Sequence, residues 1–93
     1  MMDPVIFIDS NHLIKEVNKA VMDITGYNED EIKGNTIRLL VLDLEHNEIA
    51  IHELFHKKSV KNLEVELLAK DNNKIPCLFS GAVMNDDLGE IKK

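Results

Sequence analysis

The sequence predicts an α+β fold in which strands and helices occupy separate parts of the chain. An apolar, β-branched run stands near the start, at Val5–Ile8, and an alternating apolar and polar run follows much later, at Leu63–Leu67. Between these runs, apolar residues recur at helical spacing behind helix-capping residues. Because strands and helices do not alternate along the chain, this order argues against a parallel α/β sheet.

Two short strands open the predicted fold. The run at Val5–Ile8 stops at the turn residues 9–11, and the extended pattern resumes at Leu13–Val17. We therefore expect residues 5–17 to form a hairpin.

Two asparagines mark the starts of two short helices. Asn18 precedes a helical pattern that ends at Gly26, and Asn28 precedes a second helix that ends at Gly34. Asparagine side chains accept hydrogen bonds from the free N–H groups of a first helical turn, and glycine adopts the left-handed conformation that ends many helices. Glu31 lies three residues after Asn28, which is the spacing of a capping box.

The middle of the chain predicts further helical structure. Residues 36–44 are densely apolar and are expected to form one or two helical turns. A longer helix is expected at Ile49–Lys58, where Ile51, Leu54 and Phe55 have the i, i+3, i+4 spacing of a buried stripe.

The last third of the chain changes to a period of two. Leu63–Leu67 alternates apolar and polar residues, residues 71–73 supply a turn, and Ile75–Met84 is expected to be the partner strand. We expect Glu90–Lys93 to begin a fifth strand that the sequence does not finish.

Composition narrows the class of protein. With 44% hydrophobic and 30% charged residues, residues 1–93 are expected to form a single soluble domain. The net charge of −6 and the scattered basic residues disfavour nucleic acid as a partner. No apolar run approaches the roughly 20 residues of a membrane span, and no signal peptide opens the chain, so we expect a cytoplasmic location without membrane contact. The single cysteine, Cys77, excludes an internal disulfide.

Short motifs spread along the chain resemble the PAS domain family. In the first half the resemblance rests on Val17–Ala20, Thr25–Tyr27, Glu31–Ile32 and Gly34. In the second half it rests on Lys70–Asp71, Ile75–Pro76, Ser80 and Asp87–Ile91. Each motif alone is weak, but the ordered set covers nearly the whole chain and is specific.

The resemblance implies both a fold and a function. The implied fold is an antiparallel sheet of five strands, the last one truncated and lying between the first and the fourth, with short helices packed on one face. PAS domains usually precede histidine kinases, nucleotide cyclases or transcription factors. The implied function is therefore a non-enzymatic sensing and dimerisation module of a larger signal-transduction protein, such as the histidine kinase of a two-component system. The implied partners are an output domain on the same longer chain and a second copy of this domain.

The resemblance also bears on cofactors. Light-sensing PAS domains carry a cysteine in a Gly-Arg-Asn-Cys-Arg-like run, but the corresponding run here, Gly34–Arg38, has Ile37 in its place, which excludes a photoactive flavin adduct. Haem-binding PAS domains use a histidine of the long helix, and His46, His52 and His56 lie in or near that helix. Each of these three histidines could instead be an ordinary surface residue, so we expect no cofactor. Haem or another small-molecule ligand remains an alternative.

A ligand pocket would be lined by the apolar face of the sheet and by the helices over it. The candidate ligand-binding residues are Ile37, Leu39, Ile51, Phe55, Leu63, Val65, Cys77 and Phe79. Because almost none of these side chains is polar, the same set would also form a filled core. Cys77 is expected to be a small core residue and not a reactive thiol.

A rival hypothesis comes from residues 52–56, which match the H-E-x-x-H signature of zinc peptidases. Histidines at i and i+4 of a helix can share one metal ion, with the glutamate as general base, so the alternative function is a zinc-dependent metallopeptidase or metal-binding protein. The longer zinc-peptidase motif fails because Ser59 and Asn62 replace its glycine and third histidine. His52 and His56 are also expected to lie away from the buried stripe, so we expect no catalytic residues and no bound metal.

Two leucines predict a surface for self-association. Leu68 and Leu78 fall on the strand faces opposite the apolar stripes, so both should point outward. Grouped apolar residues on an exposed sheet face often mark a contact with a partner.

Overall fold

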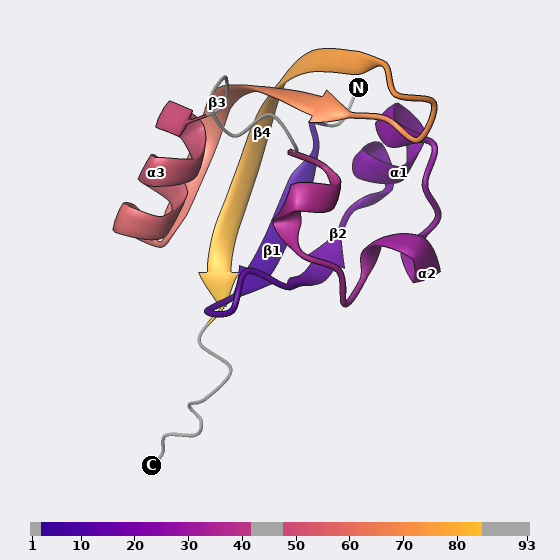
Figure 1. Ribbon diagram of the computed structural model, residues 1–93. Helices are drawn as coiled ribbons and strands as arrows, with labels where there is room; N and C mark the ends of the chain where they lie inside the picture. Colours follow the sequence, from indigo (N-terminus) through magenta and orange to yellow (C-terminus); the bar gives the residue numbers. More distant parts are fainter. Residues whose placement is uncertain (1–2, 42–47, 85–93) are drawn as a thin grey trace.

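The computed structural model describes residues 3–41 and 48–84, with the side chains of 48–50 excepted. The elements, in order along the chain, are β1 (Val5–Asp9), β2 (Ile14–Val17), α1 (Lys19–Thr25), α2 (Glu29–Ile32), η1 (Ile37–Leu39, a 3₁₀ turn), α3 (Glu48–Lys57), β3 (Ser59–Leu68) and β4 (Lys74–Met84). The helices lie along one face of a strongly twisted sheet (Figure 1). This segregation of strands and helices confirms the predicted α+β class.

The four described strands form one sheet in the order β2-β1-β4-β3. The pairs β1–β2 and β3–β4 are antiparallel, whereas β1 and β4 pair in parallel, from Val5 opposite Ser80 to Asp9 opposite Met84. The sheet is therefore mixed, and the expectation of purely antiparallel pairing was wrong at this junction.

The parallel junction has a simple geometric cause. In the expected arrangement, β1 and β4 would both pair antiparallel with one strand between them and would therefore run the same way. They keep this common direction here and pair directly with each other. Pairing satisfies backbone groups that would otherwise be buried without partners; the Ser80 N–H, for example, donates to the Pro4 carbonyl at 3.0 Å. No strand separates β1 from β4 in the described part of the chain, contrary to the expectation that a final strand would lie between them. The expected start of that strand, Glu90–Lys93, lies outside the described residues.

A buried aspartate fixes the turn between β1 and β2. The Asp9 carboxylate accepts hydrogen bonds from the backbone N–H groups of Asn11 (2.8 Å) and Leu13 (3.0 Å). His12 adopts a left-handed conformation within this turn. The side-chain hydrogen bonds of Asp9 are those expected of a turn aspartate, so the predicted hairpin is confirmed.

Both predicted N-terminal helix caps are confirmed, whereas α2 ends at Ile32, with Lys33 as its C-cap, and not at Gly34. The Asn18 side chain accepts from the Val21 N–H, and Asn28 and Glu31 form the reciprocal hydrogen bonds of a capping box. Gly26 ends α1 in the left-handed conformation, with φ +82°.

Strand β3 begins four residues before the predicted start at Leu63. The reason is a β-bulge: residues 61 and 62 together oppose Ser80, and Asn62 has a φ of +56°. The bulge lets Val60 and Leu63, three residues apart, face the same side of the sheet. The bulge interrupts the alternation of side chains between the two faces. The period-two pattern therefore identifies only the part of β3 that follows the bulge.

The core lies between the sheet and the helices. Its fully or nearly fully buried members come from every described element; the strands supply Ile6, Ile8, Ile14, Val60, Val65, Leu67 and Phe79. The helices and the segment after η1 supply Val21, Ile32, Ile37, Leu40, Val41 and Leu54.

Candidate functional site

The eight predicted pocket residues come together in one apolar layer. Ile37 of η1, Val65 of β3 and Phe79 of β4 belong to the buried core, with exposed fractions of 3%, 5% and 2%. The other five pack against that core and are half-buried; they are Leu39, Ile51, Phe55, Leu63 and Cys77. The strand register places Leu63 opposite Phe79 and Val65 opposite Cys77, which gives the sheet side of the layer a continuous apolar surface.

The turn η1 is attached to both ends of this layer. The Ile37 N–H donates to the His12 carbonyl at 2.9 Å, which ties η1 to the β1–β2 turn. At its other end, the Leu68 N–H of β3 donates to the Leu40 carbonyl at 2.7 Å. Backbone hydrogen bonds therefore connect the η1 segment to both the first hairpin and β3.

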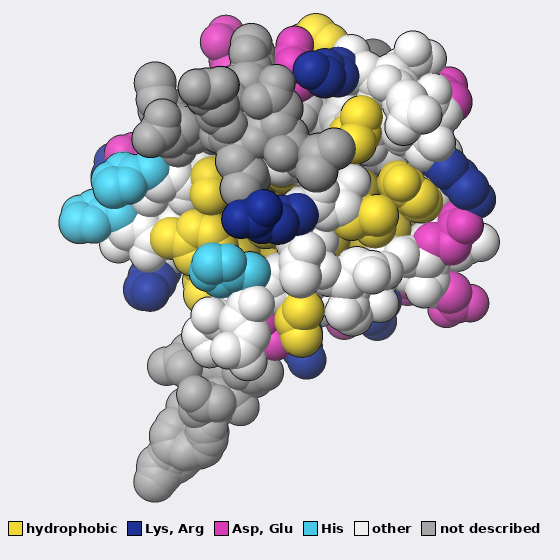
Figure 2. Space-filling model, viewed as in Figure 1, with side chains coloured by type: hydrophobic (Ala, Val, Ile, Leu, Met, Phe, Trp, Pro, Cys, Tyr) yellow, Lys and Arg dark blue, Asp and Glu magenta, His cyan; other side chains and the backbone are white. Residues whose placement is uncertain are grey.

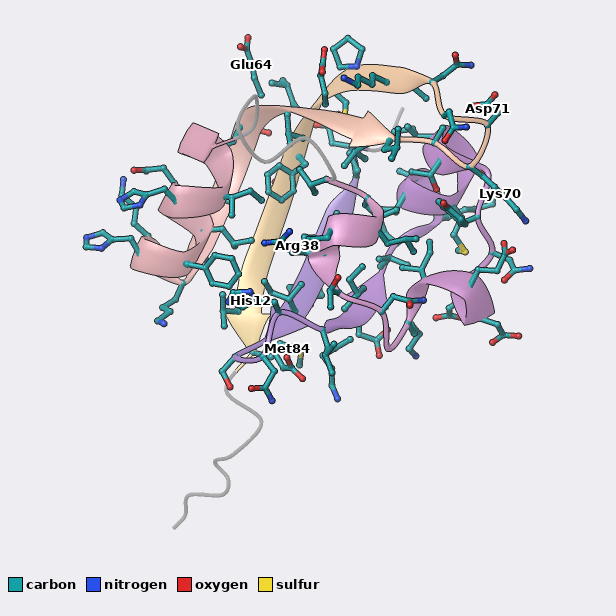
Figure 3. The ribbon with its side chains drawn as sticks, in the orientation of Figure 1. His12, Arg38, Glu64, Lys70, Asp71 and Met84 are labelled. Atoms are coloured by element: carbon teal, nitrogen blue, oxygen red, sulfur yellow. The ribbon has the colours of Figure 1, made fainter. Side chains whose placement is uncertain are left out.

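An aromatic contact joins the first hairpin to α3. The rings of His12 and Phe55 lie 4.1 Å apart between centroids, tilted by 39°. Figure 3 shows His12 at the turn between β1 and β2, beside α3. The sequence analysis did not predict this contact, because the two residues are 43 positions apart and no local pattern indicates such a pair.

Cys77 is half-buried on the side of β4 that faces the layer. Burial, followed by the negative charge of Asp3, raises the pKa of the Cys77 thiol. Because the thiolate is the nucleophilic form, a raised pKa disfavours reactivity. This agrees with the prediction of a core cysteine.

The H-E-x-x-H residues occupy the solvent side of α3. His52 and His56 are exposed, and Leu54 between them is fully buried on the opposite side. Lys57 forms an ion pair with Glu53 at 2.8 Å, and this hydrogen bond lowers the pKa of the Glu53 carboxyl. A general base works best with a pKa near the working pH, so this glutamate is poorly suited to that role. Within residues 3–41 and 48–84, no group of three or more His, Cys, Asp or Glu side chains could hold a metal ion.

An ion pair between distant parts of the chain was also missed. Lys70, in the turn between β3 and β4, contacts the Glu31 carboxylate of α2, and its ammonium lies 5.9 Å from the centre of the Tyr27 ring. The Lys70 N–H donates to the Thr25 carbonyl at 2.7 Å. Figure 3 shows Lys70 and Asp71 at this turn, next to the first two helices. The ion pair and the backbone hydrogen bond thus connect the late hairpin to the α1–α2 segment.

Comparison with known proteins identifies the fold family. The family model of the PAS domain matches residues 2–93. The chain belongs to the PAS domain family. Its fold is similar to the crystal structure of the PAS domain of a protein from Colwellia psychrerythraea, with a TM-score of 0.58 and 20% sequence identity. That similarity covers 77% of this chain and 62% of the other, and at this identity it shows the fold alone. No curated protein matches this sequence.

PAS domains are sensory modules of signalling proteins, and the whole-length match makes this chain one of them. Ile37, which stands where light-sensing members have their cysteine, is buried in η1. Of the three histidines considered as haem ligands, His52 and His56 are exposed and His46 lies outside the described residues. No helix in the described part of the chain is long and apolar enough to cross a membrane.

Proposed function

We propose that this PAS domain is the input module of a longer signal-transduction protein, such as a cytoplasmic histidine kinase, and that it senses a small apolar ligand held in the layer between η1, α3, β3 and β4. The observation that carries the proposal is the gathering of all eight candidate residues into that one layer in a chain of the PAS family. Because their side chains offer hydrocarbon and one thiol, the fitting ligand is an apolar molecule rather than an anion.

The connections of η1 provide the route by which a ligand would act. A ligand that spreads α3 or η1 from the sheet changes the hydrogen bonds of Ile37 and Leu40, and with them the first hairpin and β3. A ligand shifts such an equilibrium only by its difference in affinity for the two arrangements. The output domain on the same chain would read the change.

Native mass spectrometry of the purified chain tests the ligand. We expect a discrete mass above the sequence mass that is lost on denaturation, with the released compound partitioning into an organic phase. A native mass equal to the sequence mass, unchanged after incubation with apolar cell extract, contradicts the ligand part of the proposal.

Two variants with the same chemical change separate the layer from the rest of the sheet. Leu63→Phe enlarges a side chain within the layer, whereas Leu78→Phe enlarges one on the opposite face of the paired strand. We expect the first to reduce ligand occupancy and the second to leave it unchanged. Equal ligand occupancy in the two variants would show that the ligand does not bind in this layer.

The outer face of the sheet supports a second proposal, that the domain associates with itself. Leu78 is 43% exposed and Met84 is 41% exposed, while Leu68 is half-buried. The register places Leu68 opposite Lys74 and Leu78 opposite Glu64, on the side of the β3–β4 pair away from the core. We propose that a second copy of the domain covers this face.

Sedimentation of the double variant Leu68→Glu, Leu78→Glu tests this contact. We expect wild-type chains to associate at high concentration and the double variant to remain monomeric. The double variant His52→Glu, His56→Glu adds the same two charges on exposed positions of α3, and it should associate like the wild type. Unchanged sedimentation of the sheet-face variant would exclude that face as the contact.

A further inference from the structure

Two imidazoles stand one helical turn apart on the exposed side of α3. The ring centroids of His52 and His56 are 5.7 Å apart and the ring planes differ by only 7°. Both residues are exposed, and histidine side chains gather at the surface beside α3 (Figure 2). Neither the apolar layer nor the sheet face uses them.

This spacing suits a shared metal ion. Residues at i and i+4 have Cβ atoms about 5–6 Å apart on a helix, so two imidazoles can converge by side-chain rotation alone. Each would place a nitrogen about 2.0–2.1 Å from a zinc-sized ion. Because both rings are exposed, they can turn toward one ion without displacing the buried Leu54 on the other side of α3.

The surroundings limit what such a site can do. The Glu53 carboxylate, between the two histidines in sequence, is engaged by Lys57. The described residues supply no third ligand that would make a group of three. Two protein nitrogens with water in the remaining positions select ions that prefer imidazole, and they do not favour Mg²⁺ or Ca²⁺, which prefer oxygen ligands.

We propose that His52 and His56 form a two-imidazole binding site for a late first-row divalent metal ion, Cu²⁺, Ni²⁺ or Zn²⁺, on α3. Binding bridges successive turns of the helix and so stabilises the folded chain by mass action. This site goes beyond the proposed sensing function and does not depend on it.

Calorimetric titration and thermal unfolding of the untagged chain with Ni²⁺ or Zn²⁺ test the site. We expect one ion per chain, Ni²⁺ or Zn²⁺ raising the melting temperature, and Mg²⁺ leaving it unchanged. At a free metal concentration about ten times the dissociation constant, the rise should be roughly 5–10 °C. No binding by either transition metal, or an equal rise with Mg²⁺, would overturn the proposal.

Single variants locate the ligands. Replacing a residue that only hydrogen-bonds to a metal ligand weakens metal binding about 10–100-fold. Loss of a direct ligand should cost at least as much, so His52→Ala and His56→Ala should each weaken Ni²⁺ binding by at least about tenfold. His12→Ala removes a ring that packs on the same helix and should retain the wild-type affinity. Glu53→Gln should retain it as well, because its carboxylate is not a ligand. Wild-type affinity in either single histidine variant, or loss of binding in Glu53→Gln, contradicts the assignment.

A change of spacing at constant composition provides the matched control. The double variant His56→Lys, Lys57→His keeps every histidine and every charge but places the two rings at i and i+5. Residues five apart do not share a helix face as i and i+4 do, so this variant should lose the Ni²⁺ affinity while keeping the wild-type circular dichroism spectrum. If a correctly folded swap variant binds Ni²⁺ as tightly as the wild type, the two-imidazole site is wrong.

Discussion

Both halves of the described chain contribute to the core, but the side chains that set the ends of their elements differ. In residues 5–34, polar side chains fix the ends of helices by hydrogen bonds to the nearby backbone, as Asn18 and Asn28 do. Helices as short as α1 and α2 are not stable alone, so these caps define where they begin. In residues 51–84, apolar side chains from separate elements pack together, and Leu54 of α3 is fully buried against the core formed with the strands.

The glycines show the same difference. Gly34 has a φ of +87°, and apart from the glycine and its chain neighbours no described atom lies within 4 Å of where its Cβ would stand. Glycine therefore serves the backbone conformation there. Gly81 lies on β4, and a Cβ there would come within 2.8 Å of the Ile6 carbonyl oxygen of β1. Glycine serves the close approach of two strands at this second position. The constraint is therefore the backbone conformation at Gly34 and the contact between two strands at Gly81.

The largest effect should come from emptying the core under α3. Leu54→Ala removes a fully buried side chain and should lower the free energy of unfolding by about 2–5 kcal/mol, measured by urea denaturation. Leu54→Met, which keeps the volume, should lower it by less than about 1.5 kcal/mol. If Leu54→Ala lowers the free energy of unfolding no more than a surface substitution does, apolar packing does not hold α3 against the sheet.

A smaller effect is expected where β1 meets β4. Gly81→Ala should lower the free energy of unfolding by about 1–3 kcal/mol, because its methyl group pushes against the Ile6 backbone and the Phe79 ring.

Asparagine substitutions distinguish the two kinds of glycine. Asparagine adopts the left-handed conformation more readily than alanine, so Gly34→Asn should be less destabilising than Gly34→Ala. At position 81, where space is the constraint, asparagine should be more destabilising than alanine. If alanine and asparagine rank in the same order of destabilisation at both positions, the two glycines do not serve different purposes.

The difference between the two halves also explains how much of the fold could be predicted. Caps such as the Asn28–Glu31 box depend on residues three positions apart, and the sequence displays them directly. The bulge at residues 61 and 62, the parallel pairing of β1 with β4 and the contact between His12 and Phe55 depend on which distant segments meet. The apolar layer could be predicted because strand alternation and helical spacing each point its members inward, but a period alone cannot separate a ligand site from a filled core.

A further prediction compares the two asparagine caps. The Asn18 side chain accepts from Val5 and Val21 and donates to the Asp3 carbonyl, so it joins α1 to the start of β1. Asn18→Ala should cost about 2 kcal/mol in the free energy of unfolding, at the upper end of the range for caps, and Asn28→Ala about 1 kcal/mol. Equal costs would mean that the long-range hydrogen bonds of Asn18 add nothing to its local cap.

Glu31 is the residue at which the two halves meet. One carboxylate oxygen accepts from the Asn28 N–H in the capping box, and the other contacts the ammonium of Lys70 in the late hairpin. The hydrogen bond from Lys70, followed by that from Asn28, lowers the pKa of the Glu31 carboxyl below its ordinary value of 4.5. A carboxyl with a lowered pKa in the folded state adds stability that is fully present above its unfolded pKa and is lost as the pH falls through the folded one.

The smallest expected effect is therefore one that depends on pH. Glu31→Gln keeps the shape of the side chain and an acceptor for the capping box but removes the charge that Lys70 faces. At pH 7 the variant should melt only slightly below the wild type, because exposed ion pairs contribute little. The difference in melting temperature should shrink as the pH falls below about 4.5. It should vanish once Glu31 is protonated in both states, because the wild type then carries no charge there either.

Lys70→Met should produce the same small loss of stability at pH 7, and adding Glu31→Gln to it should cost less stability than Glu31→Gln alone. A difference between Glu31→Gln and the wild type that stays constant from pH 7 to pH 3 would show that the charge contributes nothing, leaving the two halves joined at this point by the backbone hydrogen bond from Lys70 to Thr25.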